Sequence, residues 1–262
     1  MGPFLQKCLN TIYAHRSHTN QAIILAYHSV ADNTLGFTVT PAAFAQHMDF
    51  LRSKQFNVVS LDQLAAYRKQ GVIPPKTVAI TFDDGFQDNY TIAFPILKAH
   101  GFPATIFLTT SSLAGERVLH GVPLKILSED ELRTLQHSGL VTIGAHTTTH
   151  PKFTKITQDA MEREVQESKN MVEQILGVPC LHFAYPHGRH SAEAYVAVAR
   201  AGIIYAYTTE VGSVRSTDNS YALNRNVIDH TTSLEEFTRI VLYGRVSLTR
   251  VRRDLRASGF PI

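Results

Sequence analysis

Two adjacent carboxylates are the first chemical feature of this sequence, in the segment ITFDDG at positions 80–85. The apolar residues before them are typical of a β-strand, and Asp83 and Asp84 then stand side by side before Gly85. Adjacent like charges repel each other, so the presence of both carboxylates calls for an explanation by structure or by chemistry. One reason is structural, because Asp-Gly is a common turn signal and an acidic residue can cap the next helix. The other reason is chemical and depends on which residues lie nearby.

A pair of histidines four positions apart, His146 and His150 in the segment HTTTH, offers ligands for a metal ion. On a straight strand the two side chains would lie about 13 Å apart, too far to share one ion. We therefore expect His146 at the end of a strand and the threonines curling the chain back. Because the chain contains 13 histidines, a chance pairing is the alternative for this motif taken alone.

One aspartate and these two histidines would form a three-ligand site that leaves a fourth position open for water. If one carboxylate of the DDG segment binds a divalent cation, the repulsion between Asp83 and Asp84 is removed. The other carboxylate is then free to accept a proton from water during attack on a carbonyl group. This ligand set favours Zn²⁺ and also suits Co²⁺, Ni²⁺ or Fe²⁺. Gly85 lets the chain turn away without a side chain that blocks the cleft.

Strand-like and helix-like segments alternate from about residue 22, and no low-complexity linker divides them. This alternation favours a single-domain parallel barrel or a doubly wound sheet. Ligands bind at the carboxyl ends of the strands in both architectures. The expected strands are 22–27, 57–60, 77–82, 104–110, 141–145, 182–185, 204–209 and 221–228. The expected helices start at Pro41 and cover 61–69, 92–100, 128–139, 158–176, 191–201 and 234–243.

Polar residues follow several of these strands at the same end of the sheet, whereas an average surface would scatter them. His28 follows the first strand, the two aspartates follow the third, and His146 follows the fifth. Tyr185 and His187 follow the sixth strand, and Arg225 interrupts the last one. We expect these residues to gather around one site.

Three motifs in a fixed order make the sequence similar to a known family: TFDDG at 81–85, HTTTH at 146–150 and FAYPHG at 183–188. They resemble the polysaccharide deacetylases of the NodB-like carbohydrate esterase family 4. The segments AYHSV at 26–30 and ALNRN at 222–226 resemble its exopolysaccharide-associated subgroup. The resemblance implies an α/β fold, a distorted (β/α) barrel with seven or eight parallel strands. It also implies metal-dependent removal of an N-acetyl group from an amino sugar that is free, oligomeric or lipid-linked.

The motifs assign roles to individual residues by this resemblance. Asp83 matches the catalytic base, and the residues that match the metal ligands are Asp84, His146 and His150. Thr147 matches the residue that helps to fix the metal-binding loop, and His187 takes the place of the residue whose backbone N–H helps to hold the oxyanion. By the same resemblance, the residues expected to bind the substrate are Tyr185, His187 and Thr147.

The sequence departs from the family pattern at two points. Ala184 stands where an arginine usually orients the base, and no clear LxH motif follows the last strand to supply a general acid. Because a cation inside a strand-like run is costly unless it is paired, we expect Arg225 to point into the barrel mouth and pair with Asp83. We expect His28 to protonate the leaving amine. The alternatives are a surface position for Arg225 and a structural role at the core edge for His28.

The composition limits the classes of function. A net charge of +3 over 262 residues is too small to indicate a nucleic-acid partner. Cys8 and Cys180 make neither a disulfide framework nor a CxxC pair. No apolar run approaches the ~20 residues of a membrane span, and the first residues lack the continuous apolar core of a signal peptide. We therefore expect a cytoplasmic protein, either free or peripheral at the inner membrane.

The domain organisation expected from the sequence is simple. An apolar stripe in residues 1–20 predicts a helical extension before a deacetylase-like domain at 21–262. Docking of this helix on its own domain is favoured over association with a membrane surface.

Two other functions fit the same motifs. A non-catalytic carbohydrate-binding relative would keep the fold, but binding alone does not need an unligated carboxylate beside a metal. A metal-dependent deformylase or cyclic amidohydrolase on the same barrel would use the same attacking groups. We expect N-deacetylation of an N-acetylated carbohydrate because the resemblance implies it.

Overall fold

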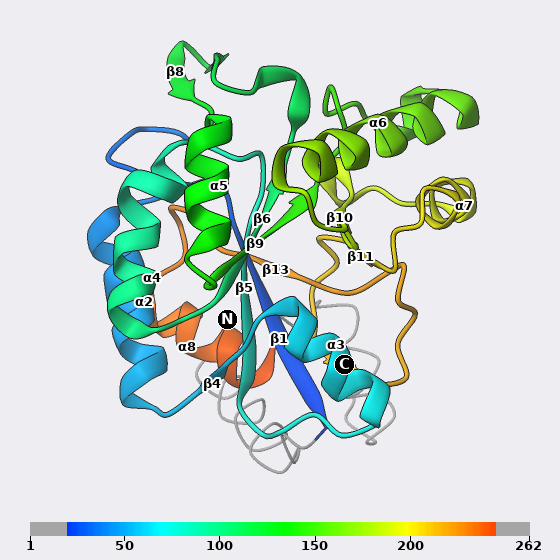
Figure 1. The fold of residues 1–262 in the computed structure, drawn as a ribbon. Coiled ribbons are helices and arrows are strands. Elements are labelled where there is room, and N and C mark those ends of the chain that lie inside the picture. Colours follow the sequence, from blue (N-terminus) through cyan, green and yellow to red (C-terminus); the bar gives the residue numbers. More distant parts are fainter. Residues whose placement is uncertain (1–19, 245–262) are drawn as a thin grey trace, which may run out of the picture.

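The computed structural model describes residues 20–244 and consists of a curled sheet with helices packed around it (Figure 1). The helical extension expected at residues 1–20 lies outside the described residues, apart from Asn20. Within residues 20–244, no helix has both the length and the apolar character needed to cross a membrane.

The main sheet has nine strands, and parallel pairing dominates it. They are β1 (Gln21–Tyr27), β4 (Asn57–Val58), β5 (Thr77–Phe82), β6 (Ala104–Leu108), β9 (Val141–Ala145), β10 (His182–Ala184), β11 (Tyr205–Tyr207), β12 (Val214–Arg215) and β13 (Asn226–Val227). Their central order is β11-β10-β9-β6-β5-β1-β12, with β13 beside β1 and β4 beside β5. Of these nine strands only β12 runs antiparallel to its neighbour. The parallel, barrel-like α/β fold expected from the sequence is confirmed.

The segment 220–228 lies between the two edges of the parallel sheet. At its start, Leu223 pairs with Tyr207 of β11, and at its end β13 pairs in parallel with β1. The sequence predicts one continuous strand over 221–228. Only Asn226–Val227 has regular strand pairing, because the chain leaves β11 and crosses to β1 in between. Arg225 lies at this crossing, next to the carboxyl ends of the strands.

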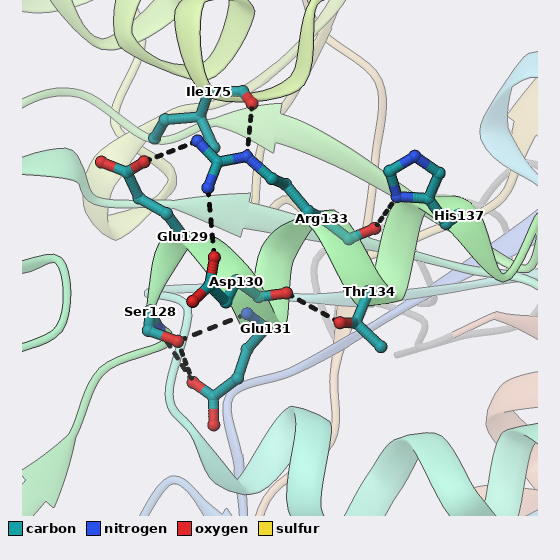
Figure 2. A network of polar contacts seen from close by, with 8 residues as sticks. All are labelled: Ser128, Glu129, Asp130, Glu131, Arg133, Thr134, His137 and Ile175. Atoms are coloured by element: carbon teal, nitrogen blue, oxygen red, sulfur yellow. Dashed lines mark hydrogen bonds and ion pairs between the residues drawn. The ribbon is translucent and has the colours of Figure 1, made fainter.

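Seven α-helices surround the sheet within residues 20–244, and most begin where the sequence predicts. They are α2 (Pro41–Ser53), α3 (Leu61–Gln70), α4 (Phe94–His100), α5 (Glu129–His137), α6 (Gln158–Leu176), α7 (Ala192–Arg200) and α8 (Leu234–Tyr243). Local capping sets their first turns: Thr40 caps α2, and Ser128 and Glu131 form the expected capping box of α5 (Figure 2). Before α4, residues 89–93 form a π-helical turn instead of the expected start of that helix.

Alternate residues of β1 and β5 face two different apolar clusters. In β1, Ile23 packs toward the helices on the outer face, whereas Ala22 and Ile24 belong to an inner cluster. Leu64 of α3 joins this inner cluster, and α3 lies near the amino end of β1 (Figure 1). Apolar side chains therefore fill the inside of the curled sheet as far as Phe107, Ala184 and Tyr207 near the carboxyl ends of their strands, and the polar groups lie on the loops that follow.

A β-hairpin that the sequence does not predict stands near the carboxyl ends of the strands (Figure 1). Its strands β7 (Glu116–Leu119) and β8 (Val122–Lys125) pair antiparallel. A second small sheet joins β2 (Ser29–Val30) and β3 (Thr38–Val39). Both additions lie in segments of the chain that follow strands of the main sheet, so they extend the walls around the polar end.

Candidate active site

The loop after β5 carries both carboxylates at the carboxyl end of the sheet. Asp83 and Asp84 are 2% and 7% exposed, so one dipeptide buries two acidic groups. Asp84 has a φ of 70° and Gly85 a φ of 77°, which makes a sharp left-handed turn. A Cβ atom at Gly85 would lie 2.5 Å from Leu108, so both the backbone angle and the close approach favour glycine here.

The loop after β9 brings the two histidines together. The N–H of His146 donates to the carbonyl oxygen of Leu108 at 2.9 Å and so continues the strand pairing by one residue. Thr147 then adopts a φ of 67°, and its hydroxyl accepts a hydrogen bond from the N–H of His150 at 3.0 Å. The chain curls back as predicted, and the centroids of the two imidazole rings lie 4.9 Å apart.

Asp84, His146 and His150 form a cluster that could hold a metal ion, because their ligand atoms all lie within 4.8 Å of one another. His150 Nε2 lies 3.6 Å from Asp84 Oδ1. Nδ1 of His146 lies 2.7 Å from the carbonyl oxygen of Ala184, which can only accept, so this nitrogen carries the proton. The other ring nitrogen of His146 keeps its lone pair. Two imidazoles and a carboxylate are a donor set that fits a divalent cation.

Burial keeps both imidazoles of this cluster neutral near pH 7. Burial, assisted by the neighbouring His146, lowers the pKa of His150 to about 4. Burial also lowers the pKa of His146, although the negative charges of Asp83 and Asp84 oppose that shift. Neutral imidazoles have the free lone pair that metal coordination requires.

Arg225 lies in the barrel mouth and binds Asp83 through both carboxylate oxygens. The two N–O distances are 2.6 and 2.7 Å, and the guanidinium is fully buried. Its Nε donates to the carbonyl oxygen of Thr208, one NH donates to the hydroxyl of Thr81, and the group lies 5.2 Å from the centre of the Phe107 ring. Each guanidinium nitrogen therefore has a partner, as a buried cation requires. The pairing expected from the sequence is present, and the alternative of a surface arginine is wrong.

The pairing decides the charge of Asp83. Burial by itself raises the pKa of this carboxyl, but the charge of Arg225, with a smaller contribution from His146, outweighs burial. The pKa of Asp83 is therefore held well below its usual range, and the group stays ionised at neutral pH. Arg225 thus supplies, from the segment between β11 and β1, a cationic partner that Ala184 cannot supply.

His28 follows β1 at the rim of the site and is half-buried. It lies within electrostatic range of Asp83 and Asp84, and its ring centroid is 5.7 Å from that of Phe37. Its Nδ1 is buried and has no hydrogen-bond partner among the described residues. This nitrogen is enclosed, so any contact of His28 with a substrate would come from the exposed part of its ring.

Of the three residues expected on the substrate side, only His187 is exposed. Its ring centroid lies 4.7 Å from that of His150, and its φ of 56° is left-handed. Tyr185 and Thr147 are fully buried, and the substrate-binding role expected for them stays a prediction. The hydroxyl of Tyr185 donates to the carbonyl oxygen of Tyr221, and the hydroxyl of Thr147 holds the histidine loop.

Two residues that the sequence did not single out contact the loops that carry the Asp84, His146 and His150 cluster. Arg117 of β7 donates to Asp84 Oδ1 at 2.9 Å. Glu164 of α6 accepts hydrogen bonds from the N–H groups of Thr148 and Thr149 at 2.9 and 2.8 Å. Neither residue belongs to a motif, and both reach the site from elements placed by long-range packing. A single sequence carries no signal that would have identified them.

The chain matches the family model of polysaccharide deacetylases over residues 70–206, more than half of its 262 residues. The matched part contains both carboxylates of the DDG segment and both histidines of the cluster. His28 and Arg225 lie outside it.

The chain is also similar to individual proteins over longer stretches of sequence than the family model covers. YxkH of Bacillus subtilis is 29% identical over 203 residues, which cover 77% of this chain and 69% of that protein. A poly-beta-1,6-N-acetyl-D-glucosamine N-deacetylase of Staphylococcus aureus is 25% identical over 232 residues, which cover 80% of this chain and 79% of that protein.

Solved structures extend the likeness to the fold. A polysaccharide deacetylase from Bacillus cereus aligns with a TM-score of 0.73 at 25% identity, covering 85% of this chain and 69% of that chain. IcaB from Ammonifex degensii aligns with a TM-score of 0.76 at 21% identity over 85% of this chain and 96% of its own, and this likeness concerns the fold alone. Motifs, family match and fold agree, and the chain belongs to the polysaccharide deacetylase family.

Proposed function

We propose that this protein is a metal-dependent hydrolase that removes N-acetyl groups from an N-acetylated amino sugar. One observation carries the proposal: a buried carboxylate, held ionised by Arg225, adjoins a cluster of one aspartate and two histidines. A protein that only bound carbohydrate would gain nothing from a second buried carboxylate beside such a cluster, because burying a charge is costly. The pair of carboxylates is explained if one holds an ion and the other moves a proton.

The proposed ligands of the ion are Asp84, His146 and His150, and Zn²⁺ is the proposed metal, with Co²⁺, Ni²⁺ and Fe²⁺ as alternatives. When bound, a divalent ion would polarise the acetyl carbonyl group and lower the pKa of a water molecule. The chain itself contributes neutral imidazoles, one of them oriented by the carbonyl oxygen of Ala184.

Asp83 is the proposed proton acceptor. Its carboxylate is ionised at neutral pH, and the two hydrogen bonds from Arg225 fix the direction of both oxygens. The same pairing makes Asp83 a weak base, because a proton acceptor with a low pKa accepts only from an acidic donor. A nucleophile acidified within the site meets that condition, so the proposed base and the proposed ion depend on each other.

His28 is the proposed donor of a proton to the leaving amine, because the half-buried residue lies at the rim of the site within electrostatic range of Asp83 and Asp84. His187 is the proposed substrate-side residue, with its exposed ring next to His150 and its backbone N–H as the oxyanion donor. A donor of this kind typically contributes about 3–4 kcal/mol to the stability of a transition state.

The proposed substrate contains N-acetylglucosamine units, since the name of the S. aureus relative specifies poly-beta-1,6-N-acetyl-D-glucosamine. Acetate release from N-acetylated monosaccharides, oligosaccharides and lipid-linked sugars, with and without a chelator, tests the activity and separates these forms. Activity that is lost with chelator, restored by Zn²⁺ and absent in His146→Ala is the expected result. Full activity in chelator would contradict the proposal, and release of formate or opening of a cyclic amide would replace it with the deformylase or amidohydrolase alternative.

The domain boundaries and the location are also proposals. We propose that an N-terminal extension at 1–20 precedes a catalytic domain at 21–262, and that the protein is cytoplasmic, either free or peripheral at the inner membrane. Fractionation of cells that make the native protein tests the location. Recovery of the protein outside the membrane would contradict it.

A further inference from the structure

Arg117 of the β7–β8 hairpin contacts the metal-site loop and has no role in the function proposed above. Exposure alternates along β7, where Glu116 and Val118 are exposed while Arg117 and Leu119 are partly buried. The hairpin therefore turns the face that carries Arg117 toward the loop after β5.

The hairpin is attached to this loop by contacts that do not involve Arg117. The N–H of Leu127, which follows β8, donates to the carbonyl oxygen of Gly85 at 3.0 Å. The hairpin and the loop also share a buried apolar cluster of Leu35, Phe86, Leu124 and Ile126. The position of the hairpin should therefore survive the loss of the Arg117 side chain.

The contact places a positive charge on one particular oxygen atom. Asp84 Oδ1 lies 2.9 Å from NH1 of Arg117 and 3.6 Å from Nε2 of His150. The side chains of Arg117 and Asp84 are 21% and 9% exposed, so solvent screens this ion pair only in part. A guanidinium also keeps its charge at any pH at which the protein is folded. The oxygen that faces a proposed metal ligand is thus already bound to a cation.

We infer that Arg117 is a placeholder cation, which neutralises Asp84 in the metal-free protein and opposes the binding of a divalent ion there. The inference rests on the proposed metal ligands. An interaction that is stronger in the metal-free state stabilises that state and weakens metal binding by the same factor. Removing the guanidinium should therefore tighten metal binding and, at the same time, destabilise the metal-free protein. A residue that only oriented Asp84 as a ligand would instead support metal binding, so its removal would weaken the binding of the metal ion.

The test measures two quantities for Arg117→Met and for the wild type. The first is the dissociation constant for Zn²⁺, by competition with a chromophoric chelator, and the second is the Tm with and without Zn²⁺. We expect a dissociation constant lower by at least ~10-fold, since repulsion between a single and a double charge at contact distance is lost. The Tm of the metal-free variant should fall, and the Tm of the loaded variant should stay near that of the wild type.

Arg133 of α5 offers a matched control. It pairs with Glu129 and Asp130 and donates to the carbonyl oxygen of Ile175, so none of its partners belongs to the metal cluster (Figure 2). Arg133→Met removes a paired guanidinium of the same kind and should leave the dissociation constant for Zn²⁺ unchanged. Arg117→Lys keeps the charge but lacks the planar guanidinium group. Its dissociation constant for Zn²⁺ should lie between those of Arg117→Met and the wild type.

The outcomes separate this inference from the proposed function. If the wild type binds no Zn²⁺, the proposed metal site fails and the inference fails with it. If the wild type binds Zn²⁺ and His146→Ala does not, but Arg117→Met binds equally well or more weakly than the wild type, only the inference is overturned. Tighter binding in both Arg117→Met and Arg133→Met would also overturn it, because the effect would then be a general one of net charge.

Discussion

Asp83 and Asp84 are neighbours in the chain, yet each carboxylate meets a different arginine. Asp83 is bound by Arg225 from the crossing between β11 and β1, and Asp84 by Arg117 from the hairpin. The first pair is fully enclosed and uses both oxygens, whereas the second uses one oxygen and is partly open to solvent. Two chemically identical residues can therefore take different roles, one as a proton acceptor and the other as a metal ligand.

Substitution of each aspartate by asparagine should separate these roles. Asp83→Asn should still bind Zn²⁺ but lose at least ~10²-fold in kcat/KM, the lower range for a positioned proton acceptor. Asp84→Asn should lose both Zn²⁺ and activity, because an amide oxygen is a weaker ligand than a carboxylate. Elemental analysis and acetate release measure the two effects. An active Asp83→Asn enzyme would show that the two carboxylates have been assigned in the wrong order.

The pH profile of kcat/KM should report on Arg225 and His28. The pKa of Asp83 is depressed, so its carboxylate form is present at neutral pH and is lost only as the pH falls through that low value. Arg225→Ala should raise the pKa of the acidic limb and cost about 3–5 kcal/mol of stability, because a buried carboxylate is left unpaired. His28→Ala should weaken or remove the basic limb. If the acidic and basic limbs of the pH profile are unchanged in both Arg225→Ala and His28→Ala, neither residue acts on the reacting groups.

Several residues in the loops that form the site have a left-handed backbone conformation, which residues other than glycine rarely adopt. Asp84, Thr147, His150 and His187 all have φ values between 56° and 70°. Such conformations persist only when surrounding contacts hold them, and they occur often at functional sites. For the histidine loop the contacts come from α6, where Glu164 accepts from two N–H groups and from the hydroxyl of Thr149.

Glu164→Ala should therefore weaken metal binding through the loop. His146 is held separately by the carbonyl oxygen of Ala184, so His150 is the ligand expected to lose its place. We expect the dissociation constant for Zn²⁺ to rise ~10–100-fold, as for other residues that orient metal ligands. Activity should return at saturating Zn²⁺, which a loss of the fold would not allow.

Glu167, exposed on the same helix, provides the control, because Glu167→Ala removes an equal charge without touching the loop. Equal Zn²⁺ affinity in the two variants would contradict the role given to Glu164.

Elements governed by local signals were predictable from the sequence, and elements governed by distant partners were not. The caps of α2 and α5 and the end of α6 at Gly177 are set by residues within one turn. The β7–β8 hairpin depends on a cluster that includes Phe86, and the strand expected at 221–228 is cut short by its crossing between two edges.

The same division applies to the site. The DDG and HTTTH motifs indicated the carboxylates and the histidines, and the cost of a buried cation indicated the partner of Asp83. Arg117 and Glu164 carry no such signal. Burial of Tyr185 and Thr147 also had to come from the structure, because a motif gives the position of a residue but not the direction of its side chain.

At the scale of the molecule, the beginning and the end of the described chain pack against each other. The hydroxyl of Tyr27 in β1 lies 3.1 Å from Nδ1 of His47 in α2, and the His47 ring stacks on Phe237 of α8 at 4.0 Å. His47 is 1% exposed, and burial lowers its pKa to about 4. An imidazole that must stay neutral therefore lies where three elements from both parts of the chain meet.

Stability should consequently depend on pH through His47. The pKa of His47 is lower in the folded protein than its usual 6.5. The contribution of the neutral imidazole to the free energy of unfolding is therefore complete above pH 6.5 and is lost as the pH falls from 6.5 toward 4. The full loss from this group is about 3 kcal/mol. Chemical denaturation of wild type and His47→Phe at pH 7 and 4.5 measures it, and the variant should lose less stability between the two. An equal loss of unfolding free energy in the wild type and in His47→Phe would contradict this role of His47. Between pH 7 and 8 the unfolding free energies of the two proteins should differ by a constant amount.

The ion pair between Asp83 and Arg225 joins residues that are 142 positions apart. A ribosome that adds roughly 5–20 residues per second needs on the order of ten seconds to make the chain between them. Throughout that interval Asp83 has already been synthesised, while the guanidinium that will neutralise it does not yet exist. Burying an ionised carboxylate without a partner is costly, so we expect the end of the barrel around Asp83 to stay open to water until the crossing segment has been made. The ion pair that holds Asp83 ionised can therefore form only late in biosynthesis, and the segment that supplies Arg225 is also the segment that joins the two edges of the sheet.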